Sequence, residues 1–460
     1  MKIERLTDQS CRSILARLDQ RGDLLTLEEP VDAHHEVAAV LSLVDARRAV
    51  RFASIRDHET GIFAGILSDL DRIAMVLGVP AAEIQDRLIA SISRPVAPQI
   101  VEAAPVQEVV RHDNVLSSLP VPWFFARETG PYITAGLIVA RDPETGLGNA
   151  SYARLKVLGP SEALIGIAPN HHLSIMARKA AARGETLPFA VVLGAHPAIQ
   201  LAACFYLGLG DDEIHCAGAL LGEPVRLVKA RTSDLLVPAE AEIVLEGEIH
   251  ADDIIVEGLV SEYHGMYEDY GTGVRATFGC QTRRADAMLQ VIEPGYHAEH
   301  LYLGAVPIAA SLRAQLARVI PNVGQVAVTL SGSGRTNVVV QIDRPRPGQA
   351  KRAMMACWSA VSIVKNVTVV DVDIDPWDLA AVELAKMNRM RAERDVLIVP
   401  GMSADRSEPQ EERGMVTKTG YDATCKPGDR KEGFEPALPP PEAMERMRAL
   451  LTKHHPELGL

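Results

Sequence analysis

The pattern of apolar residues changes twice along the 460 residues, and this limits the fold more than any single motif. Residues 1–105 and 301–460 alternate helical spacing with short apolar strands, whereas residues 106–300 read mainly as short β-branched strands separated by turns. Strands broken by turns favour a curled, barrel-like sheet over a βαβ array. We therefore predict an α/β (α+β) protein with a small N-terminal α/β unit (1–105), a central split β-barrel (106–300) and a C-terminal α/β domain (301–460).

Within these parts the spacing predicts particular elements. The expected helices are Asp8–Gln20, Leu173–Ala182, Gln349–Ser362, Pro376–Asn388 and Glu442–Thr452. The expected strands are Ala135–Arg141, Phe189–Gly194, Val225–Lys229, Glu242–Leu245 and Asp253–Val256, followed by 326–330, 338–342 and 367–374. The last helix follows a run of prolines, so it extends from the domain and either packs on a partner subunit or lies on the surface.

Charge and composition exclude several classes of partner. The 47 basic and 60 acidic residues give a net charge of −13, which opposes binding to nucleic acid or to an anionic membrane surface. No run approaches the ~20 apolar residues of a transmembrane helix, and the charged N-terminus does not resemble a signal peptide. The six cysteines show no CxxC spacing, which is typical of free thiols in a reducing cytoplasm.

The first polar cluster is Asn149-Ala-Ser151-Tyr-Ala-Arg154. The segment alternates as one strand would, so we expect Asn149, Ser151 and Ala153 to share one face and Arg154 to point to the other. Taken alone, an arginine in a strand more often pairs with a surface carboxylate than serves a site.

Two further segments carry possible ligands for a metal or a phosphate. His171 and His172 lie where the 173–182 helix begins, and the N-terminus of a helix attracts phosphate; a partial cap is the simpler role. Glu213 follows two aspartates in a turn, where acidic residues are usually solvated. With an amide oxygen and an imidazole, Glu213 would form an oxygen and nitrogen ligand set that suits Mg²⁺ or Mn²⁺ better than Zn²⁺.

The fourth segment holds two carboxylates five residues apart, Glu257 and Glu262, after an apolar strand. One carboxylate held ionised by an arginine, beside another that is less well paired, is a common arrangement for acid–base chemistry. A hairpin with two exposed glutamates explains the same segment equally well.

Together and in this order, the segments resemble the UbiD decarboxylase family. The shared order is Asn149 to Arg154, His172, Glu213, AGALLGEP (217–224), VPAEAE (237–242), EGEI (246–249) and Glu257 to Glu262. The similarity is close over residues 137–267, and VVDVDIDPWDL (369–379) and the segment at Tyr421 resemble the family's C-terminal domain.

The resemblance implies a cofactor, prenylated FMN, bound by the central split barrel. It implies that Asn149, His172 and Glu213 hold Mn²⁺ (or Mg²⁺) at the cofactor phosphate, with K⁺ near Ala203–Phe205. It also implies that the cofactor is contacted by Asn149, Ser151, Tyr152, Ala153, Arg154, His171, His172, Cys204 and Glu213. His172 is preferred to His171 as the metal ligand because it directly precedes the helix.

The same resemblance implies a catalytic network of Arg154, Glu257 and Glu262, with Glu262 as proton donor. The implied reaction is the reversible, non-oxidative decarboxylation of an aromatic, heteroaromatic or α,β-unsaturated carboxylic acid, releasing CO₂. The family obtains its cofactor from a flavin prenyltransferase and forms homodimers or homohexamers through the C-terminal domain. Where many members have Pro-Phe-Gly between the glutamates, this chain has Leu259-Val260-Ser261, a change beside the expected substrate position.

Two other functions remain open from the sequence. One is an FMN-dependent oxidoreductase built on a split barrel, which would bind unmodified FMN and oxidise NAD(P)H. The other is a non-catalytic subunit of a decarboxylase complex that keeps the fold. The intact set of ligands and charged residues favours the decarboxylase.

Overall fold

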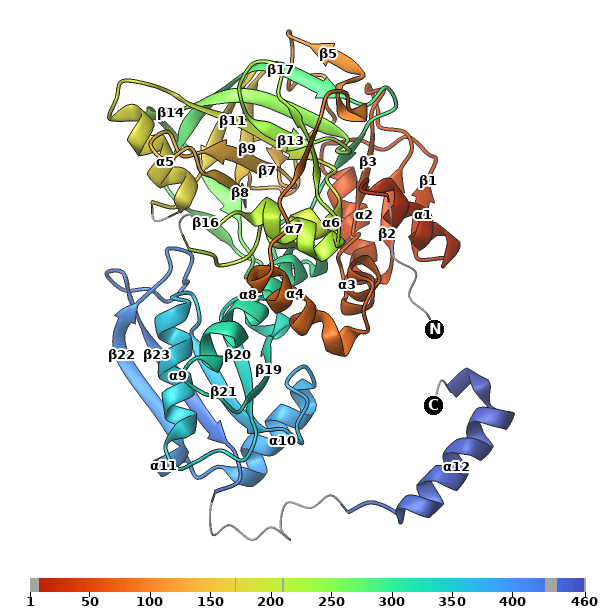
Figure 1. Cartoon of the computed structure of the whole chain (residues 1–460), viewed down its shortest axis with the longest axis vertical. Coiled ribbons are helices and arrows are strands. Elements are labelled where there is room, and N and C mark those ends of the chain that lie inside the picture. The colour runs from red at the N-terminus through yellow and green to blue at the C-terminus, as the bar shows by residue number, and fades with distance from the viewer. Residues whose placement is uncertain (1–7, 170, 209–210, 427–436, 459–460) are drawn as a thin grey trace.

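The computed structural model describes residues 8–169, 171–208, 211–426 and 437–458. Figure 1 shows the N-terminal part beside a curled central sheet, with the C-terminal domain below both. The helix α8 (Ala298–Ala317) lies between the upper and lower parts.

The N-terminal part is a small sheet covered by helices, as the alternating pattern predicts. Its strand order is β1-β2-β3-β18, with bounds Leu24–Leu27, Ala49–Phe52, Gly61–Ala64 and Met288–Gln290. The helices are α1 (Arg12–Gln20), α2 (Glu36–Val44), α3 (Leu70–Leu77) and α4 (Ile84–Ser93). The first predicted helix is therefore confirmed, beginning at Arg12. Because β18 comes from far along the chain and pairs in parallel with β3, this sheet is complete only when the central part has folded.

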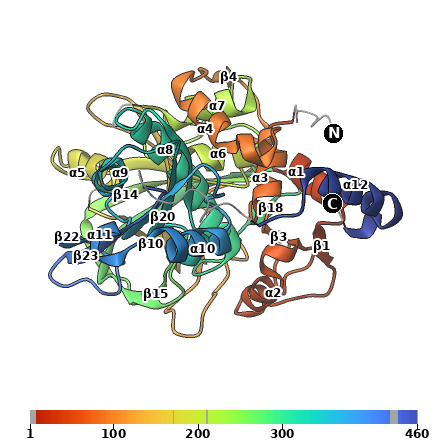
Figure 2. The ribbon, with the colours of Figure 1, turned by 90° about the horizontal axis from the view of Figure 1, so that it is seen from below.

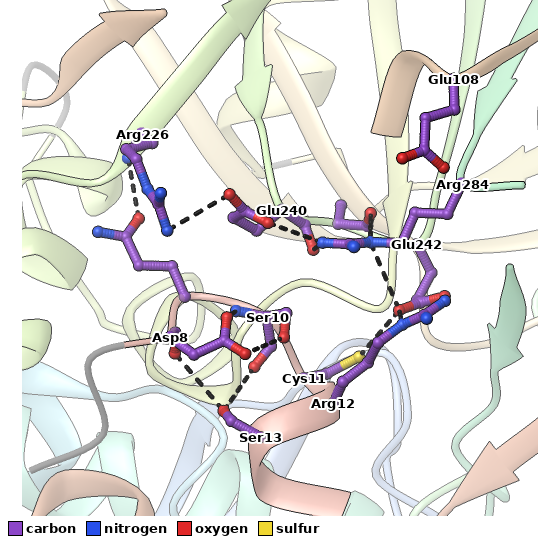
Figure 3. A network of polar contacts seen from close by, with 12 residues as sticks. Asp8, Ser10, Cys11, Arg12, Ser13, Glu108, Arg226, Glu240, Glu242 and Arg284 are labelled. Carbon is purple, nitrogen blue, oxygen red and sulfur yellow. Dashed lines mark hydrogen bonds and ion pairs between the residues drawn. The ribbon is translucent and has the colours of Figure 1, made fainter. Parts of the chain in front are cut away.

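A buried carboxylate joins α1 to the central part (Figure 3). Glu242 is fully buried, and its two oxygens accept from Arg12 Nε at 2.6 Å and Nη2 at 2.8 Å. Arg284 approaches the same carboxylate at 3.7 Å, and the backbone N–H of Met288 donates to it at 3.0 Å. Loss of Arg12 would remove the close ion pair of a fully buried carboxylate, so the N-terminal and central parts stabilise one another. One continuous apolar core, from Cys11 to Ala310, also spans them.

The central sheet is curled, which confirms the predicted barrel-like architecture. Its order is β6-β9-β10-β17-β14-β11-β7-β8, with β5 pairing to β17. The bounds are β5 Val109–Arg111, β6 Tyr132–Ile133, β7 Leu137–Arg141, β8 Gly148–Tyr152, β9 Arg154–Gly159, β10 Glu162–Gly166, β11 Leu187–Leu193, β14 Ile243–Val256 and β17 Thr272–Arg283. Strand β8 ends the order on one side and β9 lies near the other, yet only Ala153 separates them in sequence. Because one residue cannot cross a flat sheet of this width, the sheet has to curl.

The two separate strands predicted at Glu242–Leu245 and Asp253–Val256 are wrong. They belong to one strand, β14, whose first residues are buried and whose later residues, from Asp252, are mostly exposed. A register shift between His250 and Ile254 accommodates Asp252 and Asp253 within the strand. The exposed stretch from Asp252 is the part of β14 that leaves the core.

Shorter elements complete the central part. The helices are α5 (His172–Ala181), α6 (Pro197–Ala202) and α7 (Glu213–Leu221). Strands β4 (Gln99–Val101), β12 (Arg226–Lys229) and β13 (Leu236–Pro238) form one small sheet, and β15 (Leu259–Ser261) and β16 (Tyr267–Asp269) form another.

The C-terminal domain is a five-stranded sheet with helices on it. Its order is β19-β20-β21-β23-β22, with bounds Val323–Val328, Asn337–Ile342, Asn366–Asp371, Met415–Ala423 and Val396–Ser403. The helices are α9 (Gln349–Ala360), α10 (Leu379–Arg389) and α11 (Ala392–Asp395). Helix α8 links this domain to the rest, because Leu303 and Val306 lie in the first core and Ile308 and Leu312 in the second.

The last helix, α12 (Pro441–His454), stands apart from the sheet in both views (Figures 1 and 2). None of its residues is buried, and Met444, Met447 and Leu450 are exposed. The predicted extended terminal helix is confirmed. Among the described residues, every helix is too short or too polar to cross a bilayer.

Candidate active site

Two adjoining cavities lie between the curled sheet and the C-terminal domain. The larger, about 440 Å³, is lined by Asn149, Ser151, His172 and Glu213, and the smaller, about 290 Å³, by Arg154 and Glu262. Their shared wall consists of Tyr152, Ala168, His171, Cys204 and Arg335. Of the predicted site residues, Ala153 lines the smaller cavity, and Glu257 lies behind Arg154.

In the larger cavity the structure brings Asn149 and Glu213 together. The Asn149 amide, on β8, donates to Ser151 Oγ at 3.1 Å, so these side chains share a face. Glu213 begins α7, and its Oε2 accepts from the Ala150 N–H at 2.9 Å. Burial raises the pKa of Glu213 to about 7, and no cation of the described chain pairs with it within 4.0 Å. A buried carboxylate without a cationic partner is a favourable position for a bound metal ion.

The two histidines occupy different places. His172, the first residue of α5, lines only the larger cavity, whereas His171 stands at the N-cap position without a side-chain capping bond and lines both cavities. Burial lowers the pKa of His171 to about 4, so its ring is neutral at pH 7. His171 Nδ1 and the Tyr152 hydroxyl are buried without a hydrogen-bond partner in the described chain. Unsatisfied polar atoms in a shared wall fit a bound polar cofactor.

The donor set also fits a hard divalent cation. Asn149, His172 and Glu213 offer an amide oxygen, an imidazole and a carboxylate, the ligand types that Mn²⁺ or Mg²⁺ accepts. The described residues contain no cluster of three His, Cys, Asp or Glu residues of the kind that forms a metal site unaided. A metal here would therefore need the asparagine and further oxygens from a ligand such as phosphate. Burial raises the pKa of the nearby Cys204 thiol to about 12, which leaves it protonated.

At the smaller cavity Arg154 and Glu257 form a bidentate ion pair. Arg154 Nε and Nη2 donate to the two Glu257 oxygens at 2.7 and 2.6 Å, and the Glu257 side chain is fully buried. Arg154 opens β9, so the predicted single strand from Asn149 to Arg154 is wrong: the turn at Ala153 separates two strands. Opposite Arg154 on β10 stands Gly166, where an added Cβ would lie only 2.8 Å from the guanidinium carbon. The glycine leaves space for the arginine.

The backbone on both sides of Glu257 is also fixed. The Glu257 carbonyl accepts from the Thr129 hydroxyl at 3.0 Å and from Lys156 Nζ at 2.8 Å. The next residue, Gly258, has φ +80°, a conformation that favours glycine and redirects the chain into β15. Glu257 is therefore held at both its carboxylate and its main chain.

Glu262 follows β15 and reaches the smaller cavity from a tight loop. Its N–H donates to the Met266 carbonyl at 3.0 Å, and the Gly265 N–H donates back to the Glu262 carbonyl at 2.8 Å. Burial and a hydrogen bond with Glu262 raise the pKa of the Tyr270 hydroxyl. The Arg154 guanidinium lies 4.8 Å from the centre of the same tyrosine ring. Glu262 therefore faces the cavity beside the Arg154–Glu257 pair without being locked into it.

Several residues at the site escaped the sequence analysis. Glu128 is buried, and its Oε1 accepts from the Ser261 N–H at 3.2 Å and from Ser261 Oγ at 3.0 Å, directly before Glu262. Arg335 and Arg406 line the smaller cavity from the C-terminal domain. Single charged residues in turns give no periodic signal, and only the fold brings them to the cavity.

Comparisons with known proteins agree along the chain. Models of the 3-octaprenyl-4-hydroxybenzoate carboxy-lyase (UbiD) family match its N-terminal domain at residues 15–92, its Rift-related domain at 99–297 and its C-terminal domain at 301–423. An anhydromevalonate phosphate decarboxylase of Methanosarcina mazei is 31% identical over 432 residues, covering 94% of this chain and 99% of that protein.

Solved structures give the same result. The UbiD-class enzyme HmfF from Pelotomaculum thermopropionicum, in complex with FMN, superposes with a TM-score of 0.91 at 35% identity, covering 95% of this chain and 98% of that one. An evolved dimeric form of that enzyme in complex with prFMN gives 0.87 at 34% identity, with the same coverage. The chain belongs to the UbiD family of carboxy-lyases.

Proposed function

We propose that the protein is a prenylated-FMN-dependent decarboxylase in which Arg154, Glu257 and Glu262 carry out the reaction. The observation that supports this most directly is the buried Arg154–Glu257 pair beside Glu262 on one cavity, next to a second cavity with Asn149, His172 and Glu213. The substrate is an aromatic, heteroaromatic or α,β-unsaturated carboxylic acid. The reaction replaces the C–CO₂⁻ bond by a C–H bond, consuming one proton and releasing CO₂.

In this proposal the protein residues divide the work. Prenylated FMN, when bound, supplies the electron sink that an sp² carbon needs on losing CO₂. Arg154 faces the substrate carboxylate, and Glu257 fixes the orientation of that guanidinium. Glu262 delivers the proton to the carbon that loses CO₂ and, in the reverse direction, removes it. The loop after β15 allows the Glu262 carboxylate to approach the substrate, whereas Glu257 is held in place.

The larger cavity would hold the phosphate end of the cofactor. Asn149, His172 and Glu213 would bind Mn²⁺ or Mg²⁺, and Ser151, Tyr152, His171 and Cys204 would contact the cofactor. A K⁺ ion would lie near the backbone of Ala203–Phe205. The metal offsets the repulsion between an anionic phosphate and the buried Glu213 carboxylate.

The C-terminal domain would join subunits into a homodimer or a homohexamer. The exposed apolar side chains of α12, together with its separation from the sheet, support this assignment. Light scattering of the full chain and of a chain ending before Pro441 would test it. A smaller assembly after truncation is expected, and an unchanged mass would contradict the role of α12.

The decisive experiment is co-expression with a flavin prenyltransferase, followed by mass spectrometry of the extracted cofactor and assays of CO₂ release. We expect the prenylated mass, bound metal and turnover of at least one acid from an aromatic and acrylic panel. Expression without the prenyltransferase is the control and should give an inactive protein. Unmodified FMN with NAD(P)H oxidation would favour an oxidoreductase, and failure to bind metal and flavin would favour a non-catalytic subunit.

A further inference from the structure

Two arginines of the C-terminal domain line the smaller cavity without a carboxylate partner. Arg335 lies between the 3₁₀ turn Leu330–Gly332 and β20, and Arg406 follows β22. Within the described residues no carboxylate oxygen lies within 4.0 Å of either guanidinium. Arg154, on the other side of the same cavity, is satisfied by both oxygens of Glu257. Arg154 therefore has a carboxylate partner, whereas Arg335 and Arg406 have none among the described residues.

The fold reserves space for Arg335. A Cβ at Gly304, inside α8, would overlap the Arg335 guanidinium. Glycine within a helix costs about 1 kcal/mol relative to alanine, so this position is unfavourable for the helix alone. Gly166 has the same relation to Arg154. Each guanidinium is therefore seated against a glycine.

The hydrogen bonds that hold the Arg335 guanidinium occupy only some of its N–H donors. Nη1 donates to the Gly334 carbonyl at 2.9 Å, and contacts to the carbonyls of Leu301 and His300 are long, at 3.4 and 3.5 Å. A guanidinium has five N–H donors, and bonds of this length are weak. The carbonyls orient Arg335 and leave most of its charge and donors for a ligand.

Arg406 is held by an aromatic ring. Its guanidinium lies 4.3 Å from the centre of the Tyr270 ring, the ring that Arg154 also contacts. The neighbouring Asp405 forms no ion pair with it among the described residues; its Oδ1 accepts from the N–H of Ser407 at 3.0 Å and from its hydroxyl at 2.6 Å. Arg406 therefore brings a second uncompensated positive charge to the cavity.

The side chains that line the smaller cavity carry more positive charge than a substrate with a single carboxylate would neutralise. Arg154, Arg335 and Arg406 face one lining carboxylate, Glu262, while Glu257 behind the wall compensates Arg154. Burial lowers the pKa of His300, and the charge of Arg335 lowers it further. In a protein of net charge −13, this concentration of positive charge is local.

We propose that the acid bears a second anionic group, a carboxylate or a phosphate, which Arg335 and Arg406 bind. This inference rests on the proposed decarboxylase function and adds the class of substrate. The departing carboxylate lies at Arg154 and the retained anion at the other two arginines. Because these come from the C-terminal domain, the second anion would bridge that domain and the central sheet.

The test compares matched acids on the loaded holoenzyme. The pairs are sorbate with muconate and benzoate with terephthalate, and 4-phosphonooxybenzoate serves as the phosphate arm. Initial rates give kcat and KM, and the shift of the unfolding temperature gives binding without turnover. We expect each dianionic acid to have a higher kcat/KM, and to shift the unfolding temperature further, than its monoacid. The dianion with the larger effect shows whether the retained group is a carboxylate or a phosphate.

Variants assign the effect to the two arginines. Arg335→Gln and Arg406→Gln should each reduce the preference for the dianionic acid by about 10- to 100-fold, mainly through KM, because each removes charge-assisted hydrogen bonds. Flavin content should not change. Arg352→Gln, an exposed position on α9 outside both cavities, is the matched control. Gly304→Ala should reproduce the loss at Arg335, and Gly279→Ala, where the added Cβ meets nothing within 4 Å, should not.

The outcomes separate the two levels of the proposal. If loaded enzyme releases CO₂ from monoacids as well as from their dianionic partners, the second-anion site is wrong and the decarboxylase stands. Loss of flavin from the arginine variants would assign these residues to the cofactor and would also overturn the inference. If no acid of either kind is decarboxylated or bound, the proposed function itself fails.

Discussion

The two ends of the site differ in how their charges are satisfied. At the smaller cavity Arg154 and Glu257 satisfy one another, and neighbouring backbone groups hold them. At the larger cavity Glu213 is buried with no cation, and His171 Nδ1 has no partner in the described chain. The difference indicates that the Arg154–Glu257 pair is organised before any ligand binds, whereas Glu213 depends on a ligand, as do Arg335 and Arg406 in the smaller cavity. Substitution of a buried charge should therefore lower the free energy of unfolding at the Arg154–Glu257 pair, and leave it unchanged or raise it at Glu213.

The largest expected effect is that of Glu262→Gln at the reaction end. Glutamine keeps the size and hydrogen bonds of the side chain but has no proton to give, so kcat should fall by about 10²- to 10⁴-fold. Flavin content and the urea midpoint should stay at the wild-type values, because Glu262 forms no ion pair in the described chain. Asp269→Asn, exposed on the same hairpin, serves as the control. Activity near wild type in Glu262→Gln would remove the assigned proton donor.

The second test breaks the preorganised pair. Arg154→Met leaves the fully buried Glu257 carboxylate without its cation and should lower the free energy of unfolding by about 3–5 kcal/mol. The double variant Arg154→Met/Glu257→Gln should recover most of that stability and none of the activity. Urea unfolding of the protein without cofactor, beside rate assays of the loaded protein, separates the two quantities. Equal stability of Arg154→Met and wild type would show that the pair is not the buried structural unit described above.

Substitution of the buried Glu213 in the larger cavity should not lower the free energy of unfolding. Glu213→Gln removes a buried carboxylate whose burial is unfavourable, so the unfolding free energy without metal should stay constant or rise. Metal affinity should fall by at least about 10-fold, since even outer partners of metal ligands contribute that much. Titration with Mn²⁺ and the flavin retained after gel filtration measure this, and chelation of the wild type should give the same loss of flavin. Glu248→Gln, an exposed carboxylate on β14, is the control.

The elements of the fold that depend on local sequence pattern could be predicted from the sequence. The helix predicted from Leu173, the barrel-like sheet and the terminal helix follow from spacing and turn residues, and the family follows from the order of its motifs. The structure brings Asn149, His172 and Glu213 to one cavity and Arg154 and Glu262 to the other. Their roles remain predictions until the experiments above are done.

What the sequence did not reveal depends on contacts between distant segments. The turn at Ala153 was missed because the alternation of residues 149–154 is the same for one strand or for two. The length of β14 was missed because its middle is irregular: a register shift interrupts the pairing, and the residues from Asp252 are mostly exposed. Glu128, Arg335 and Arg406 carry no pattern of their own. Only the approach of the C-terminal domain and the loop before Thr129 gives them a place at the site.

The smallest expected effect concerns the contact that steadies the Glu262 loop. Ser261 stands where many family members have glycine, and its hydroxyl and N–H both reach Glu128. Ser261→Ala removes only the hydroxyl, so kcat should fall by about 2- to 10-fold with little change in KM, the cost of one hydrogen bond. Ser261→Gly should cost slightly more because glycine also frees the backbone. Ser117→Ala, at an exposed position away from both cavities, controls for serine loss in general. A rise in KM that exceeds the fall in kcat would mean that Ser261 contacts the substrate instead of positioning Glu262.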